Sequence, residues 1–344
     1  MSKLNRRALL GGIAAGAAAL ATPAIAQSRV VVRAGYIPVL GGAPLFVIDK
    51  DGWARDAGID LRIVQFDSGP NMIQAVASGT LETYWAGVAP LAVARAKGLD
   101  IRVVAATATE ELAFVAGGRL REDIDAANGN AAAGFKRFFD ATKKAARVAT
   151  QPAGSVPNVT LQHWLWEVAK IDRAHVEIVP MGIDATQQAL LAKAVDGATV
   201  REPALTIILD RDKGAKLIAS GGQMLTDQPG GVFAVTGAFV KSNEAAVQKL
   251  VDLTVRATDL LINQPERAVP SILAVLGRGI VDDATVLRAL RSPGSKFTAD
   301  PNKIVKSTQA LLEYQVKVGA NDRVPPLDGL FDDRYYRNAT RAAG

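Results

Sequence analysis

The amino-acid sequence predicts an α/β protein of two similar lobes, each an open, mainly parallel sheet flanked by helices. Two observations support this prediction. Short runs rich in Val and Ile alternate with stretches whose apolar residues recur every three or four positions, which is typical of buried parallel strands connected by helices. The same order of elements also occurs twice along the chain, which indicates two units of similar build.

Three pairs of segments form the internal repeat. Each half is predicted as strand, glycine-containing loop, helix, strand, helix, short strand and helix. In the third pair, Glu82 and Asp196 each precede a short apolar run. The residue-by-residue match is weak, so the prediction depends on the repeated order. The paired segments are residues 29–47 with 146–165, 58–66 with 173–181, and 74–98 with 188–214.

The last third of the chain is predicted to be mostly helical. A strand-like run over 230–240 precedes several helical stretches, and prolines separate them. We expect this part to return to the first lobe and cover it. The separating prolines are Pro265, Pro270, Pro293 and Pro301.

The repeat and the helical end together predict the lobe boundaries. Lobe 1 is expected to combine residues 27–107 with 231–344, and lobe 2 to comprise 108–230. The chain then crosses between the lobes near 107–113 and again near 223–231. Two crossing strands form a hinge, and the cleft between the lobes is the expected ligand site.

The first 26 residues have the features of an export signal. Lys3, Arg6 and Arg7 precede a run of small apolar residues, and residues 24–26, Ala-Ile-Ala, match the small-x-small cleavage pattern. The adjacent arginines favour the twin-arginine route over an ordinary secretory signal. A membrane anchor is the other alternative, but the stretch is rich in Ala and Gly. We expect cleavage after Ala26 and a periplasmic protein that does not span the membrane.

Composition argues against several classes of function. The formal net charge of +6 includes three positive charges of the signal, so the mature chain carries +3, too little to favour a nucleic-acid partner. The chain has no Cys, hence no disulfide and no thiol nucleophile. Its two histidines, His163 and His175, are not spaced with acids as metal ligands are. Nucleophile-elbow and phosphate-loop motifs are also absent. We expect no enzyme, no cofactor and no metal.

Residues directly after the predicted strands are the candidate ligand-binding residues. In an open parallel sheet, ligands bind beyond the carboxyl ends of the strands, where helices begin and free N–H groups attract acceptor atoms. For each loop taken singly, turn and cap chemistry is the alternative. We expect the loops to converge, with Ser68, Gly87, Ser155 and Arg201 around one shared hollow. The candidates are Tyr36, Gly42, Ala43, Ser68, Gly69, Asn71, Gly87, Val88, Thr107, Gly154, Ser155, Arg201 and Glu202.

Five segments between Arg33 and Gly231 resemble a known family. They are GYIP at 35–38, FDSGPNMIQAVASGTLE at 66–82, AGVAP at 86–90, GSVPNVTLQ at 154–162 and VREPALT at 200–206. The sequence thus resembles the nitrate/sulfonate/taurine-type family of ABC-importer solute-binding proteins, which includes binders of thiamine pyrimidine precursors. This resemblance implies a periplasmic binding protein fold of type II, with two crossings, and a small solute in the cleft.

The resemblance also implies partners and residue roles. The solute would pass to a membrane permease with its ATPase, and we expect the protein to be a monomer. Glu202 and Pro203 match an acid-proline pair that an aromatic residue often precedes, whereas this chain has Arg201 there. The other residues that match ligand-contacting loops of the family are Ser68, Gly69, Asn71, Gly87, Val88, Gly154 and Ser155.

Arg201 and Glu202 lie where a predicted strand ends and a helix begins. An arginine can hold a carboxylate or sulfonate through two parallel hydrogen bonds, so Arg201 favours an anionic solute such as a sulfonate, taurine, nitrate or a carboxylate. Glu202 can anchor an amino group of the solute or orient Arg201. A local Arg–Glu pair on a solvated rim, worth little energetically, is the alternative.

Three other functions fit the same predicted fold. The cleft can bind a neutral pyrimidine-type thiamine precursor in place of an anion. A periplasmic sensor subunit would pass its signal to a membrane kinase, and an enzyme on the same scaffold would show turnover.

Overall fold

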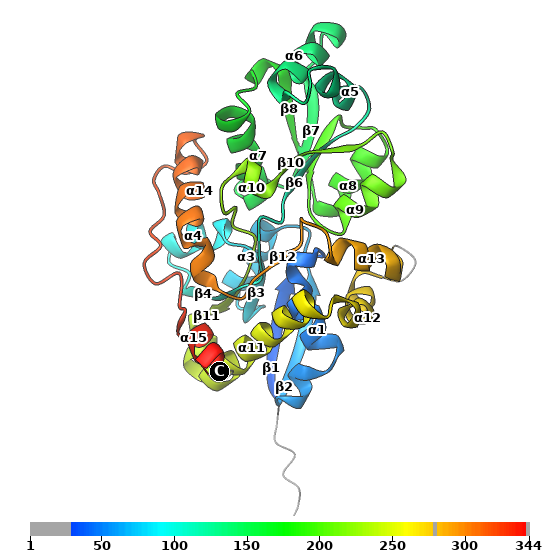
Figure 1. The fold of residues 1–344 in the computed structure, drawn as a ribbon. Helices are drawn as coiled ribbons and strands as arrows, with labels where there is room; N and C mark the ends of the chain where they lie inside the picture. The colour runs from blue at the N-terminus through cyan, green and yellow to red at the C-terminus, as the bar shows by residue number, and fades with distance from the viewer. Residues whose placement is uncertain (1–28, 278–280, 342–344) are drawn as a thin grey trace, which may run out of the picture.

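The computed structural model describes residues 29–277 and 281–341 (Figure 1). The predicted export signal and its cleavage after Ala26 lie outside the described residues. Within the described ranges the chain forms two five-stranded sheets, each flanked by helices, one above the other in Figure 1.

The sheet of lobe 1 has the strand order β2-β1-β3-β11-β4. β1, β2 and β3 pair in parallel, whereas β11 pairs antiparallel with both of its neighbours. The strands are β1 (Val30–Tyr36), β2 (Ile59–Gln65), β3 (Thr83–Gly87), β4 (Ile101–Ala106) and β11 (Gly231–Thr236).

The sheet of lobe 2 repeats this arrangement, with the order β8-β7-β9-β6-β10. β7 pairs in parallel with β8 and β9, and β6 pairs antiparallel with β9 and β10. In each sheet the reversed strand is the first strand after the chain crosses from the other lobe. The predicted fold class, two mainly parallel α/β lobes, is therefore confirmed. The strands are β6 (Ala113–Ala116), β7 (Ala146–Thr150), β8 (Val176–Pro180), β9 (Gly197–Val200) and β10 (Lys216–Ser220).

Helices connect these strands and cover their faces. Lobe 1 contains α1 (Ala43–Lys50), α2 (Trp53–Asp56), α3 (Gly69–Ala77) and α4 (Ala89–Ala96). Lobe 2 contains α5 (Gly118–Ala126), α6 (Ala131–Thr142), α7 (Val156–His163), α8 (Ile183–Leu191), α9 (Ala204–Arg211) and the one-turn α10 (Gly221–Met224). The C-terminal part contains α11 (Gly237–Asn263), α12 (Pro265–Leu276), α13 (Asp283–Leu290), α14 (Val305–Lys317) and α15 (Arg334–Arg341).

The helices that face the cleft begin through the same chemistry in both lobes. Ser68 caps α3 by accepting a hydrogen bond from the Asn71 N–H (3.4 Å), and Ser155 caps α7 by accepting one from the Asn158 N–H (3.4 Å). A proline lies in the first turn of each helix, where its missing N–H costs no hydrogen bond. These serines therefore mark the cleft end of each lobe.

Two chain segments cross between the lobes and are bonded to each other. The Glu110 N–H, in the segment after β4, donates to the carbonyl of Gln228, in the segment before β11 (2.8 Å). The first segment contains β5 (Ala108–Thr109), which pairs antiparallel with β12 (Lys296–Phe297) of the C-terminal part. The hinge region thus has a two-stranded sheet, with the second crossing segment bonded beside β5.

The C-terminal helices contact both lobes. α11 and α12 pack on α1 of lobe 1, whereas α14 packs on α7 of lobe 2 as well as on α4 of lobe 1, and α13 packs on α9 of lobe 2. In Figure 1, α14 and α13 flank the junction of the lobes on opposite sides. The Tyr314 hydroxyl donates to the carbonyl of Gln162 (3.0 Å), and Lys317 Nζ lies 2.8 Å from Glu167 Oε1. The C-terminal part therefore clamps the lobes as well as covering lobe 1.

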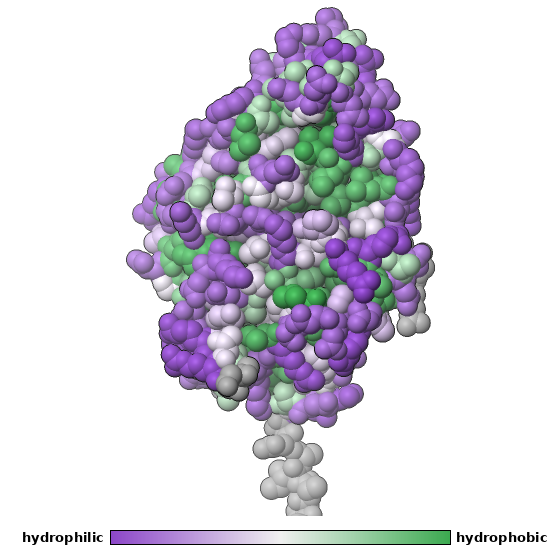
Figure 2. Space-filling model, viewed as in Figure 1, coloured by the Kyte–Doolittle hydropathy of each residue, from purple (hydrophilic) through white to green (hydrophobic). Residues whose placement is uncertain are grey.

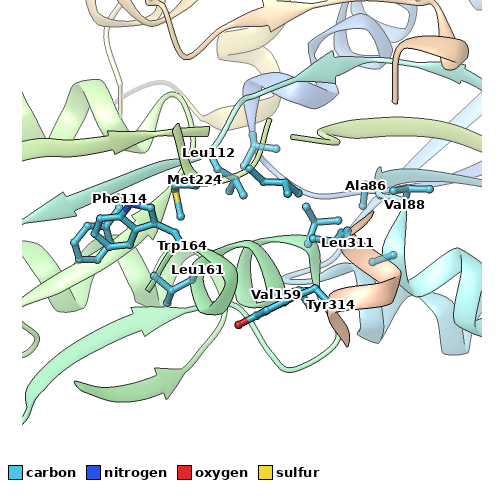
Figure 3. Close-up of a cluster of buried hydrophobic side chains, with 14 of the residues drawn as sticks. Ala86, Val88, Leu112, Phe114, Val159, Leu161, Trp164, Met224, Leu311 and Tyr314 are labelled. Carbon is cyan, nitrogen blue, oxygen red and sulfur yellow. The ribbon is translucent and has the colours of Figure 1, made fainter. Parts of the chain in front are cut away.

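One hydrophobic cluster runs through both lobes. Figure 3 shows Phe114 and Trp164 of lobe 2, Ala86 and Val88 of lobe 1, and Leu311 of α14 in this cluster. Hydrophilic residues cover most of the face in Figure 2, and hydrophobic ones gather nearer its middle. No helix in the described ranges is both long and apolar enough for a membrane span.

Candidate functional site

A cavity of about 340 Å³ lies between the lobes, and two narrower recesses adjoin it. We call these spaces the main cavity, the Ser68 recess and the Glu111 recess, after one residue that lines each recess. Ser68, Gly87 and Ser155 line the Ser68 recess, so it receives residues from both lobes. Arg201 lines all three spaces and therefore marks the point where they meet.

Eight of the thirteen candidate residues lie in these linings. Ser68, Gly87, Ser155 and Arg201, which the sequence predicts around one hollow, do surround the Ser68 recess. The other four are Gly69 in the Ser68 recess, Gly42 and Thr107 in the Glu111 recess, and Glu202 in the main cavity.

Five candidates lie outside these linings. Successive residues at a strand end point to opposite faces, so Ile37 lines both recesses while Tyr36 packs edge-to-face on Phe46, with a centroid distance of 5.2 Å. Ala43 and Val88 are fully buried in hydrophobic clusters. Asn71 is exposed and donates to Asp67 Oδ1 (2.8 Å). Gly154 lies outside as well, and its carbonyl accepts a hydrogen bond from Gln315.

Arg201 has Glu111 as its ion-pair partner. Arg201 Nη1 lies 3.6 Å from Glu111 Oε1, and both residues are 5% exposed. Glu111 Oε2 and Arg201 Nε have no hydrogen-bond partner among the described residues. Burial raises the pKa of the Glu111 carboxyl, and the Arg201 charge opposes that rise. Glu111 is not among the residues predicted from the sequence, although two consecutive acids between apolar runs, in a predicted crossing segment, are a usable signal.

The carboxylate of Glu202 is held by α9 and not by the adjacent Arg201. Its carboxylate accepts hydrogen bonds from the Thr206 N–H (3.0 Å) and the Thr206 hydroxyl (2.9 Å), within the first turns of α9. Burial raises the pKa of Glu202, against hydrogen bonds from Ser292 and Thr206 that lower it. Its backbone carbonyl accepts from the Leu40 N–H of lobe 1 (2.8 Å). Glu202 therefore caps a helix and joins the lobes through its backbone.

The lobes also touch at the lining of the Ser68 recess. The Ile183 N–H of lobe 2 donates to the carbonyl of Asp67 in lobe 1 (3.4 Å). A Cβ atom built on Gly87 would come within 2.8 Å of Val156 Cγ2 in lobe 2. Glycine at 87 therefore lets the backbone of lobe 1 approach α7 closely.

The comparisons with known proteins identify the family. The family model described as the NMT1-like family matches residues 26–274. The chain belongs to the NMT1-like family. This confirms the resemblance expected from the five motifs, and no curated protein matches the sequence.

Solved structures similar to this NMT1-like chain share its two-lobed fold. The nitrate-binding protein NrtA from Synechocystis PCC 6803 is 16% identical, with a TM-score of 0.74 over 91% of this chain and 89% of that one. The alkanesulfonate-binding protein SsuA from Xanthomonas axonopodis pv. citri, bound to MOPS, is 18% identical, with a TM-score of 0.68 over 89% and 99%. A ligand-binding component of an ABC-type import system from Staphylococcus aureus is 17% identical, with a TM-score of 0.71 over 91% and 100%.

Amide side chains supply further polar groups to the cleft of this NMT1-like protein. Gln151 lines both the main cavity and the Ser68 recess, and its Nε2 donates to Thr186 Oγ1 (3.2 Å). Gln65, Gln187 and Gln188 also line the main cavity. Gln151 is not among the predicted site residues, although it directly follows β7, and residues at that position lie at the ligand-binding edge of a parallel sheet.

The described residues include no group of three or more His, Asp or Glu side chains placed to hold a metal ion. The polar groups of the site are thus one guanidinium, several carboxylates and amides, and hydroxyls at helix starts. Such groups bind and orient a small molecule by hydrogen bonds and charge.

Proposed function

We propose that this NMT1-like protein is the periplasmic solute-binding component of an ABC importer. It traps a small solute between its lobes and delivers it to a membrane permease with its ATPase. One observation supports the proposal most: Ser68 and Gly87 of lobe 1 lie with Ser155 and Arg201 of lobe 2 around one recess beside the main cavity. A solute in the main cavity that extends a polar group into this recess touches both lobes at once.

Contact with both lobes couples binding to lobe closure. A solute that hydrogen-bonds to the starts of α3 and α7 stabilises the arrangement in which these helix ends face each other. A permease that recognises surfaces of both lobes would then distinguish the loaded form by the relative position of the lobes. The structures of NrtA and SsuA, titled as binding proteins for nitrate and alkanesulfonates, share this fold and support the proposal.

The cellular setting is part of the same proposal. We propose cleavage after Ala26, export by the twin-arginine route, and a mature monomer that works in the periplasm. Mass spectrometry of the protein recovered from periplasmic extract gives the first residue directly. An intact N-terminus on the exported protein would contradict the proposed cleavage.

Thermal unfolding and native mass spectrometry test the proposed function. The mature chain, residues 27–344, is purified without refolding and screened against sulfonates, carboxylates, nitrate, amines, amides and pyrimidines. A ligand at 100 times its Kd stabilises the native state by about 2.7 kcal/mol, which should raise Tm by several degrees. A variant that blocks the recess, Ser155→Phe, should lose the effect. Absence of any shift and of any retained small molecule would contradict the proposal.

A further inference from the structure

The ionisable residues around the cleft carry an excess of negative charge. Among the described residues that line the main cavity and the two recesses, Arg201 is the only cation. The same linings contain four carboxylates, those of Asp67, Glu111, Asp184 and Glu202. The charge of this surface therefore gives no general attraction for an anion.

The charge of Arg201 is already compensated inside the protein. Glu111 is its partner at 3.6 Å, and both side chains are almost completely buried. Charges interact more strongly when solvent is excluded, so an oxyanion placed on Arg201 would also be repelled by the neighbouring carboxylate. With Glu111 beside it, Arg201 therefore attracts an anion less than an unpaired arginine would.

The pair leaves one acceptor and one donor unused. Glu111 Oε2 and Arg201 Nε are buried and without a hydrogen-bond partner in the described part of the chain, and both residues line the Glu111 recess. A buried polar atom without a partner costs free energy. The Glu111 recess has no room for a water-sized group in this arrangement of the lobes, so a solute of matching chemistry recovers that cost only if it enters while the lobes are apart. A matching solute group presents an N–H donor next to an acceptor, as an amide or an amino-heterocycle does. The other carboxylates of the linings, Asp67, Asp184 and Glu202, favour an N–H-rich cation such as an amidinium.

The remaining walls fit the same class of solute. Apolar side chains, among them Val39, Ile183 and Ile207, line the main cavity, and Gln151 and Gln188 contribute amides. An apolar body with a neutral or cationic polar head suits these walls better than a small, fully hydrated anion does.

We infer that Glu111 is a specificity-determining residue, which neutralises Arg201 and makes the cleft select a neutral or cationic solute bearing N–H groups over an oxyanion. The inference rests on the proposed solute-binding function and specifies its solute class. Glu111 acts by its charge and by its free oxygen, so removing that charge reverses the selectivity and leaves a binding site in place.

Three probes of one shape test the inference: benzamidine as the cation, benzamide as the neutral molecule and benzoate as the anion, with nitrate and ethanesulfonate added. Calorimetric titration compares the wild-type protein with Glu111→Gln. The wild type should prefer benzamidine or benzamide to benzoate by about tenfold or more, because a hydrogen bond to a charged group is at stake. Glu111→Gln should reverse this order. Glu110→Gln removes the same charge from the neighbouring residue, whose carboxylate pairs with Lys296, and should keep the wild-type order.

A second variant tests the inference if Glu111→Gln does not fold. The double variant Glu111→Gln/Arg201→Gln removes both charges of the pair, which buried pairs tolerate better than the loss of one, and it should no longer discriminate benzamidine from benzoate. Tighter wild-type binding of the anions, with Glu111→Gln unchanged in selectivity, would overturn the inference and leave the proposed function standing.

If none of the probes binds, the test is the chemical class of the solute that is released from natively purified protein. A neutral or basic N–H-bearing solute supports the inference, and an acidic solute overturns it alone. The lack of any bound or released solute contradicts the inference together with the proposed function.

Discussion

Glu82 in lobe 1 and Asp196 in lobe 2 make the same hydrogen bonds at corresponding places in the two sheets. The Glu82 carboxylate accepts from the backbone N–H of Arg33 (2.7 Å), and the Asp196 carboxylate accepts from that of Arg147 (2.8 Å). In both lobes the N–H of the acid donates in return to the arginine carbonyl, at 3.0 Å and 2.8 Å. The acid thus joins the first strand of each half to the third.

We expect Glu82→Ala and Asp196→Ala each to lower the free energy of unfolding by about 1–3 kcal/mol, because a backbone donor loses its partner. Urea unfolding measures the change. Asp60→Ala, which removes a more exposed carboxylate paired with Arg62, is the control and should cost less than about 0.5 kcal/mol. Equal losses at all three positions would contradict a structural role for the repeated acid.

Arg201→Gln should destabilise the protein by about 3–5 kcal/mol, because it leaves the buried Glu111 carboxylate without its partner. Adding Glu111→Gln should restore much of that loss. A double-mutant cycle from urea unfolding gives the coupling energy. Additive losses from the two substitutions would show that the residues do not act as a pair.

The raised pKa of Glu202 predicts a pH dependence of stability. Its native pKa lies above the ordinary value of 4.5 because the carboxyl is buried, so the native state binds the proton more tightly than the unfolded chain does. The resulting contribution to stability is complete below pH 4.5 and is lost as pH rises through the native pKa. Unfolding free energies between pH 4 and 8 should fall less steeply for Glu202→Gln than for the wild type. Parallel curves would contradict the assignment.

Gly87→Ala should hold the lobes apart, because the new methyl group would come within 2.8 Å of Val156 across the cleft. Overpacking of this kind costs about 1–3 kcal/mol. We expect a larger radius of gyration in small-angle scattering and weaker binding of any solute retained by the wild type. Gly117→Ala, where the nearest atom lies 3.5 Å away and φ is −120°, should change neither. A Gly87→Ala protein with wild-type scattering would rule out this close approach in solution.

Sequence reasoning predicted the framework of the fold because the framework is encoded locally. Strand and helix periodicities and the caps at Ser68 and Ser155 are visible within short windows, and the repeat fixes their order. Which face of a strand meets the cleft is a tertiary property. For this reason the sequence points to Tyr36, whereas Ile37 lines the recesses.

The partner of Arg201 could not be predicted from the local sequence either. Glu111 lies 90 positions earlier in the chain, and the crossing of the lobes alone brings the two side chains together. The nearest acid in sequence is Glu202, but its carboxylate accepts hydrogen bonds from Thr206 in α9. Helical periodicity likewise predicts that α14 exists and gives no sign that it contacts both lobes.

The contacts of α13 with α9 and of α14 with α7 have a consequence for rates. Tyr314, Gln162 and Lys317 lie outside the linings of the cleft, so their contacts can persist whether or not a solute is bound. An opening motion that separates α14 from α7 would break them during solute exchange. Stronger contacts of α14 with α7 and of α13 with α9 would therefore slow both the binding and the release of the solute. The equilibrium constant for binding would still be set by the residues that touch the solute.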